Sequence, residues 1–174
     1  MTTSLELVLT TAIIAVVSAL LSLAIGVAFG SWLRSLGSRA AHLIGTITLI
    51  PFLLPPLLVG LAVFGIVGEL EVNSISGMFL VISVHVFMNF GFIAKVYAGS
   101  TINSEQIESA RLDGASDAQI RKSIEIPQQR PGLVSAGLLV ALYSATSFGL
   151  VLTLGAGKVK TLETEIAIAT LQQL

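Results

Sequence analysis

A long uncharged apolar segment near the start of the chain limits what this sequence can fold into. Residues 7–33 contain no Asp, Glu, Lys or Arg, and Glu6 and Arg34 stand on either side of them. A helix that crosses a bilayer needs about 20 apolar residues, so this segment is long enough to span a membrane. It is also longer than the apolar region of a signal peptide, and no basic residue precedes it. The sequence therefore predicts a transmembrane helix here.

Three further apolar segments predict a polytopic, all-α membrane protein. They cover residues 40–68, 75–94 and 132–154, and three prolines interrupt the first of them. The composition agrees, because only 11% of the residues are charged, whereas a soluble domain carries about 25%. The mean hydropathy is +0.93. We expect one domain, residues 1–174, with about four transmembrane helices.

The basic residues between the predicted spans indicate an orientation. Lys158 and Lys160 follow the fourth span, and the turn after the second span holds Glu69 and Glu71 but no basic residue. The positive-inside rule therefore predicts that the loop 95–131 faces the cytoplasm and that the tail 155–174 faces outward. Seven of the nine basic residues lie on the predicted cytoplasmic side: Arg34, Arg39, Lys95, Arg111, Arg121, Lys122 and Arg130.

The first half of this loop has the signals of a short helix. Asn103 or Ser104 can cap a helix that starts at Glu105, because their side chains accept hydrogen bonds from free N–H groups of a first turn. Glu105 and Glu108 would then lie near the positive end of the helix dipole. Gly114 can end the helix, because glycine accepts the left-handed conformation common just past a helix C-terminus.

The second half predicts another short helix. Ser116 and Gln119 have the spacing of a capping box. Arg121 and Glu125 are one turn apart and can pair. Pro127 is where we expect the helix to end or bend. A solvated helical linker between two spans would carry the same signals.

The spacing of five residues in the loop favours a more specific interpretation. Glu108, Ala110, Gly114, Ile124 and Pro127 fit the pattern E-A-A, three residues, G, nine residues, I-x-L-P. This stretch resembles the EAA loop of permease subunits of binding-protein-dependent ABC importers. Two positions depart from the pattern, with Ser109 in place of an alanine and Ile126 in place of a leucine.

The resemblance implies a type I ABC importer permease in a prokaryotic cytoplasmic (inner) membrane. The loop would act as a coupling helix in a groove of a cytoplasmic ATPase dimer, which would bind ATP and Mg²⁺, so this chain would be no enzyme and would bind no cofactor. Other partners would be a periplasmic or extracellular solute-binding protein, a second permease half or copy, and the lipid bilayer, but no nucleic acid. The implied ATPase contacts are Glu108, Ser109, Ala110, Asp113, Gly114, Ile124 and Pro127.

Three other stretches resemble the thiamine and iron(III) branch of these permeases. They are IPFLLPPLLVGLAVFG, HVFMNF and SFGLVLTLGAGKVKTLETEIAIATL. Members of that branch usually join two halves in one chain, so the single EAA loop implies one half or a fragment. The substrate would be thiamine, iron(III) or another small solute. The predicted spans contain no carboxylate, and a hard trivalent cation prefers anionic oxygen ligands, which favours an organic solute.

Polar residues and prolines inside the predicted spans are candidates for the translocation pathway. His85 and Asn89 are four residues apart and share a helix face, where they would form an interhelical hydrogen bond or line a path. Pro55 and Pro56 leave carbonyls unpaired, as in a simple kink or in a broken helix beside a cavity. Ser144 and Thr146 make the fourth span polar, with packing as the alternative.

Other classes of function receive less support. The chain has no cysteine and only two histidines, far apart, so we expect no metal site. A secondary transporter or channel fragment remains an alternative, although secondary transporters usually carry charged residues within their spans. A non-transporting membrane scaffold is another. Gly26 and Gly30 form a small-xxx-small pair, which indicates helix packing.

Overall fold

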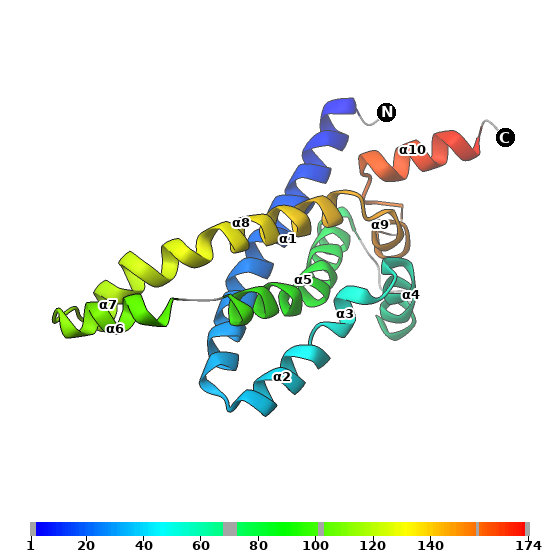
Figure 1. Ribbon diagram of the computed structural model, residues 1–174. Helices are drawn as coiled ribbons and strands as arrows, with labels where there is room; N and C mark the ends of the chain where they lie inside the picture. The colour runs from blue at the N-terminus through cyan, green and yellow to red at the C-terminus, as the bar shows by residue number, and fades with distance from the viewer. Residues whose placement is uncertain (1–2, 68–72, 101–102, 156, 173–174) are drawn as a thin grey trace.

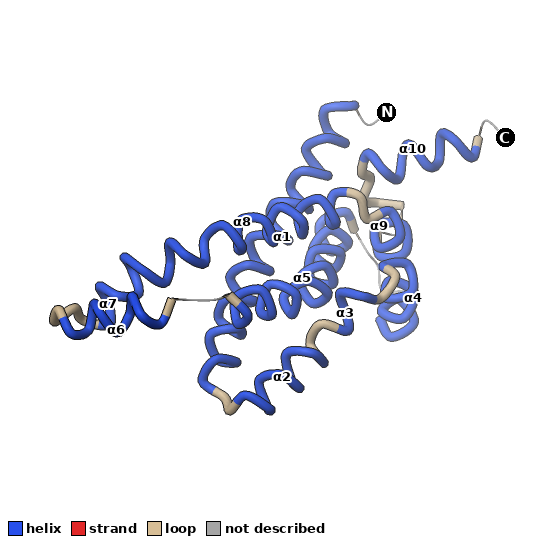
Figure 2. Tube along the Cα trace, in the orientation of Figure 1, coloured by secondary structure: helices blue, strands red, loops and turns tan. Residues whose placement is uncertain are grey.

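The structure is a computed structural model that describes residues 3–67, 73–100, 103–155 and 157–172. These residues form helices joined by short turns, without a strand among them (Figure 2). The all-α prediction is confirmed. In chain order the elements are α1 (Ser4–Ser35), α2 (Ser38–Ile47), α3 (Ile50–Leu53), α4 (Pro56–Val67), α5 (Ser74–Gly99), α6 (Ser104–Leu112), α7 (Asp117–Ile120), the π-helical turn η1 (Arg121–Glu125), α8 (Ile126–Ala145), α9 (Phe148–Leu154) and α10 (Leu162–Leu171).

Helices α1 and α5 are each long and apolar enough to cross a membrane unaided. They contain the predicted spans 7–33 and 75–94. Both begin with a capping box, formed by Thr3 and Glu6 in α1 and by Asn73 and Ser76 in α5. Their N-terminal N–H groups are thus partly satisfied by side chains, as a helix end requires.

Helices α1 and α5 pack closely and run parallel. A Cβ atom at Gly26 would lie 2.5 Å from Ile93 Cβ, and one at Gly30 would lie 3.0 Å from the Tyr97 ring, so contacts advance in the same direction along both helices. At the end of α1, Arg34 donates hydrogen bonds to the Tyr97 carbonyl (2.6 Å) and to Ser100 Oγ (2.7 Å). Its guanidinium also lies 4.4 Å from the Tyr97 ring centroid. The small-residue pair is therefore a packing site, as predicted.

The second predicted span is broken rather than continuous. The segment Ser38–Leu53 and helix α4 meet at an angle of 92°, and they form one span only if this bent pair is counted as a unit. The break falls at Leu54 and Pro55, where the extended backbone of Leu54 precedes proline, as proline favours. The sequence was compatible with either a simple kink or a broken helix at this position, and the structure has the broken helix. Residue 68, the expected end of this span, lies outside the described residues.

The fourth predicted span is also bent. The helical segment Asp117–Ala145 and helix α9 meet at 52°. After the bend, α9 packs against α4, because a Cβ atom at Gly149 would lie only 2.8 Å from the Leu57 backbone nitrogen. Figure 1 shows α4 and α9 side by side, with α8 crossing α1. The bend thus brings the end of the fourth span onto the broken second span.

Candidate functional site

Helix α6 and the turn after it form the first half of the predicted EAA loop. Asn103 Oδ1 accepts hydrogen bonds from the backbone N–H groups of Glu105 (3.0 Å) and Gln106 (3.3 Å), so the helix begins at Ser104, one residue earlier than the first expectation. Gly114 follows with φ +82°, the left-handed conformation predicted for it. The loop therefore begins with a helix that is capped by its own residues at both ends.

The turn at Gly114 is a Schellman motif. The backbone N–H of Ala115 bonds to the Ala110 carbonyl (2.9 Å), and that of Gly114 bonds to the Arg111 carbonyl (3.0 Å). These two bonds satisfy carbonyls that a helix C-terminus would leave free. The direction of the chain after α6 is thereby fixed by backbone geometry, which only a residue tolerant of positive φ provides.

The second helix starts as predicted but does not stop at Pro127. Ser116 and Gln119 form the expected capping box. The chain then stays helical through the π-helical turn Arg121–Glu125 into α8, where Pro127 occupies the first turn. The wider turn accommodates a residue that cannot donate a backbone hydrogen bond. The prediction of an end or bend at Pro127 is therefore wrong.

The predicted pair Arg121–Glu125 is also absent, although both residues are described. A π-helical turn bonds residue i to i+5, so side chains four apart no longer stack as they do in an α-helix. The loop instead has an ion pair between Arg111 and Asp117 (3.3 Å), which joins α6 to α7. Both side chains are exposed, so this pair contributes little to stability.

Gln128 attaches the start of α6 to α8, a role that the sequence did not reveal. Its amide nitrogen donates to Gln106 Oε1 (2.6 Å), and its amide oxygen accepts from the Asn103 backbone N–H (3.0 Å). These contacts join residues more than 20 positions apart, so no local spacing rule predicts them. They hold the two halves of the loop together at its base.

Most of the predicted ATPase contacts are solvent-exposed at one end of the molecule. Figure 1 shows α6 and α7 at the far end of the long helix that continues into α8. The sequence also missed Leu112, whose side chain is 85% exposed beside Asp113. Ala110 and Ile124 are partly buried. The exposed members of the predicted set are Glu108, Ser109, Asp113, Gly114 and Pro127.

Two predicted pathway residues on α5 are completely buried. His85 and Asn89 are both 0% exposed. Their hydrogen bonds stay within α5, because His85 Nδ1 contacts the Val81 carbonyl (3.0 Å) and Asn89 Nδ2 donates to the His85 carbonyl (2.7 Å). His85 Nε2 and Asn89 Oδ1 have no hydrogen-bond partner. The predicted interhelical hydrogen bond is therefore not formed in this structure.

Helix α1 presents two buried serines to this part of α5. Ser18 and Ser22 are 0% exposed, and the hydroxyl of each lacks a partner. Gly26 packs on Ile93, which is 67 positions further along the chain. Since the helices are parallel, the same offset places Ser22 at the level of Asn89 and Ser18 at the level of His85.

Ser144 of α8 reaches the same level from the other direction. A Cβ atom at Gly132 would lie 3.8 Å from Val96, and α8 runs antiparallel to α5. Ser144 is twelve residues after Gly132 on α8, and Val84 is twelve residues before Val96 on α5. The antiparallel helices therefore place Ser144 at the level of Val84, next to His85. The Ser144 hydroxyl is buried and has no partner. We call Ser18, Ser22, His85, Asn89 and Ser144 the buried polar layer.

The other three predicted pathway residues lie outside this layer, at the two helix breaks. Pro55 is exposed and Pro56 is half-buried at the 92° break. Thr146 is exposed at the 52° bend and donates to the Leu142 carbonyl (3.0 Å). The structure thus separates the six predicted residues into a buried group and a group at the breaks. Ser18 and Ser22 could have been found, because they continue the four-residue spacing of Gly26 and Gly30.

A comparison with protein families decides between the classes of function. A family model described as "Binding-protein-dependent transport system inner membrane component" matches residues 21–173. The chain belongs to this family. No curated protein matches it. The matched residues include the second half of α1, both helix breaks, the loop and all of α10.

Membership fixes the general role of the chain. It is an integral membrane permease component of an ABC importer, as the EAA pattern indicated. Membership of this family also implies partners of a general kind, which are an ATPase, a binding protein and the membrane. The interpretations as a secondary transporter or a scaffold are therefore set aside.

Proposed function

We propose that this chain forms part of a solute path and receives the motion of a cytoplasmic ATPase dimer through its EAA loop. The observation that supports the proposal most directly is the exposed, internally capped helix pair α6–α7. A short rigid helix with an exposed surface is what docking into a groove requires. The ATPase contacts in this proposal are Glu108, Ser109, Ala110, Asp113, Gly114, Ile124 and Pro127, joined by Leu112.

The continuous helix after the loop connects the proposed ATPase contact to the buried polar layer. Residues Asp117–Ala145 form one helical segment, about 43 Å long at 1.5 Å per residue. Ser144 lies at the far end of this segment, in the buried polar layer. A displacement of the docked loop therefore reaches the layer as a rigid-body shift of α8.

We assign the solute path to the buried polar layer and the two helix breaks. A buried polar atom without a partner costs about 1–3 kcal/mol, and such atoms are found on α1, α5 and α8. Water or a polar solute would satisfy them when α8 moves. His85, Asn89 and Ser144 would then face the path, while Pro55, Pro56 and Thr146 would lie on it at the breaks of the second and fourth spans.

The proposed solute is thiamine or another small organic molecule. No Asp or Glu falls within residues 7–67, 75–94 or 132–154, so the path offers no anionic oxygen for a bare ferric ion. A binding protein outside, a second permease half or copy and an ATP–Mg²⁺-loaded ATPase complete the proposed importer of a prokaryotic cytoplasmic membrane. Calorimetry of the binding protein with thiamine and with ferric chelates tests the solute, and ferric binding alone would reverse this choice.

Copurification of the ATPase with a Gly114→Val variant tests the proposed coupling. A β-branched residue at φ +82° is strained by about 1–2 kcal/mol or more, so we expect at least about fivefold less ATPase bound per permease. Gly157→Val is the matched control, because Gly157 also has positive φ (+68°) with open space around it, but lies in the tail. Equal binding by the two variants would count against the proposed docking surface.

A further inference from the structure

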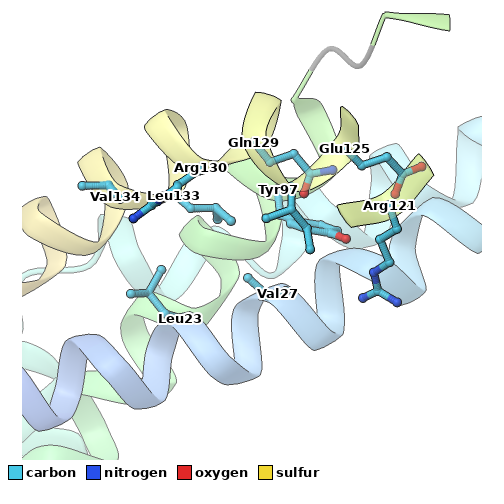
Figure 3. A pocket seen from close by; sticks show the side chains of 10 residues that line it. Leu23, Val27, Tyr97, Arg121, Glu125, Gln129, Arg130, Leu133 and Val134 are labelled. Atoms are coloured by element: carbon cyan, nitrogen blue, oxygen red, sulfur yellow. The ribbon is translucent and has the colours of Figure 1, made fainter. Parts of the chain in front are cut away.

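A cavity lies where the base of the loop meets the membrane-spanning helices. It has a volume of about 290 Å³ and lies between α1, α5 and the helix formed by η1 and α8. Figure 3 shows Leu23 and Val27 on α1 facing the row of side chains on η1 and α8. Leu133 and Val134 complete an apolar floor. The cavity is a groove open to the exterior, because Val134 is 52% exposed.

The rim of this groove is polar and carries more positive than negative charge. Arg121 and Arg130 lie toward opposite ends of the row of lining residues, with Glu125 and Gln129 between them (Figure 3). The rim thus has two guanidinium groups and one carboxylate. Arg34 donates hydrogen bonds to the Tyr97 carbonyl and to Ser100 and does not line the groove.

The apolar floor and the polar rim of the groove can each be placed relative to the predicted membrane surface. Gly137 packs on Leu23 and α8 runs antiparallel to α1, so Arg130 lies near the level of Gly30, about one turn inside Arg34. Leu23, Val27, Leu133 and Val134 lie deeper in the spans. The charge distribution over the loops predicts that this end faces the cytoplasm. The groove therefore has its Arg121 end at headgroup depth and its apolar floor at acyl-chain depth, and Arg130 lies at the boundary, beside Leu133 and Val134 (Figure 3).

We propose that this groove binds an anionic phospholipid of the cytoplasmic leaflet. An acyl chain occupies the floor, and the phosphate accepts hydrogen bonds from Arg121 or Arg130, for which the planar guanidinium is well suited. Basic pockets between transmembrane helices on this side are suited to acidic headgroups. A zwitterionic lipid would offer the same chains without the net charge. This inference depends on the topology and not on transport or ATPase docking.

The test is a titration of the purified protein with phosphatidylglycerol and with phosphatidylcholine, followed by native mass spectrometry. We expect tighter retention of phosphatidylglycerol. Each basic residue near an anionic lipid contributes about a fivefold change in affinity, so replacing both arginines (Arg121→Gln with Arg130→Gln) should weaken phosphatidylglycerol binding about 25-fold. The matched control is Arg39→Gln, because Arg39 is exposed on α2 on the same predicted side but does not line the groove.

Two further variants separate this proposal from other occupants. Glu125→Gln removes the negative charge from the rim and should strengthen phosphatidylglycerol binding about fivefold, a gain that misfolding cannot imitate. Val134→Trp fills the groove without changing charge and should weaken binding of the lipid but not of inorganic phosphate. Equal retention of the two lipids, or an equal loss with Arg39→Gln, would overturn the proposal. So would variants that alter the fraction of dimer while lipid retention stays constant, because the groove would then hold a second copy.

Discussion

At the scale of single residues, small side chains on α1 determine how closely it approaches α5. Ser18, Ser22, Gly26 and Gly30 recur every four residues, and all four are buried. Residues four apart lie on one helix face, so they form a continuous line of small side chains. In a bilayer there is little hydrophobic drive between helices, and close backbone approach supplies packing energy instead. The same line places two hydroxyls opposite His85 and Asn89.

Substitution of Gly26 tests this close approach. The added Cβ of Gly26→Ala would lie 2.5 Å from Ile93 Cβ and 2.8 Å from the Phe90 carbonyl oxygen. The Phe90 backbone cannot move aside without disturbing helix α5, so we expect a loss of about 1–3 kcal/mol in the free energy of unfolding. Gly65→Ala is the control, because Gly65 lies in helix α4 with open space around it and alanine favours a helix by up to about 1 kcal/mol. Unfolding in detergent micelles measures both, and a Gly26→Ala protein as stable as wild type would refute the packing argument.

The sequence predicted residues whose roles are local, and it failed where a role depends on distant contacts. Gly114, Ser116 and Gln119 behave as expected, because turn and cap chemistry involves neighbours within a few positions. The link of Gln128 to Asn103 across 25 positions left no such pattern. The burial of His85 was likewise open, since a polar residue in a span can face either a path or the interior.

At the scale of elements, the π-helical turn Arg121–Glu125 sets the orientation of the loop relative to α8. It lies between α7 and α8 in one continuous helical segment. A π-helical turn contains one more residue than an α-helical turn would, and such turns are common at functional sites. The surface of α6 that we propose for docking is therefore placed by this turn and by the contacts of Gln128.

Deletion of Ser123 tests this role of the turn. Ser123 is exposed within the π-helical turn, and its removal should leave an ordinary α-helix. The loop would then rotate by about 100° relative to α8, so the docking surface would face away from an ATPase below the membrane. We expect little copurified ATPase but unchanged helix content by circular dichroism. Ser123→Ala keeps the residue count and should bind normally, whereas normal binding by the deletion variant would contradict the proposed orientation.

The bends in the second and fourth spans show where prediction of elements from sequence stops. Uninterrupted apolar segments gave α1 and α5 correctly, and Pro55 marked the position of the 92° break. The 52° bend after Ala145 has no proline, and α9 instead packs on α4 with Gly149 against Leu57. That contact joins segments about 90 positions apart, so hydropathy along the chain could not reveal it.

At the scale of the whole molecule, the parallel arrangement of α1 and α5 places their C-terminal ends on the same side as the loop. Arg34 binds Tyr97 and Ser100 at this end, and α8 returns antiparallel from it. At the opposite end Ser74 contacts the tail, because Ser74 Oγ donates a hydrogen bond to the Lys158 carbonyl (3.2 Å). The two ends differ in charge, and that difference is the basis for the predicted orientation.

Cysteine labelling can test this orientation directly, because the chain has no native cysteine. Asp117→Cys lies at the exposed tip of the loop, and Lys158→Cys lies in the exposed turn at the opposite end. In intact cells, a membrane-impermeant thiol reagent should modify position 158 and leave position 117 unmodified until the membrane is opened. In inverted vesicles the pattern should be exchanged. Labelling of position 117 alone from outside would reverse the topology and remove both the ATPase docking and the cytoplasmic-leaflet lipid site, while labelling of both would show that the bent helix α8–α9 does not cross the membrane.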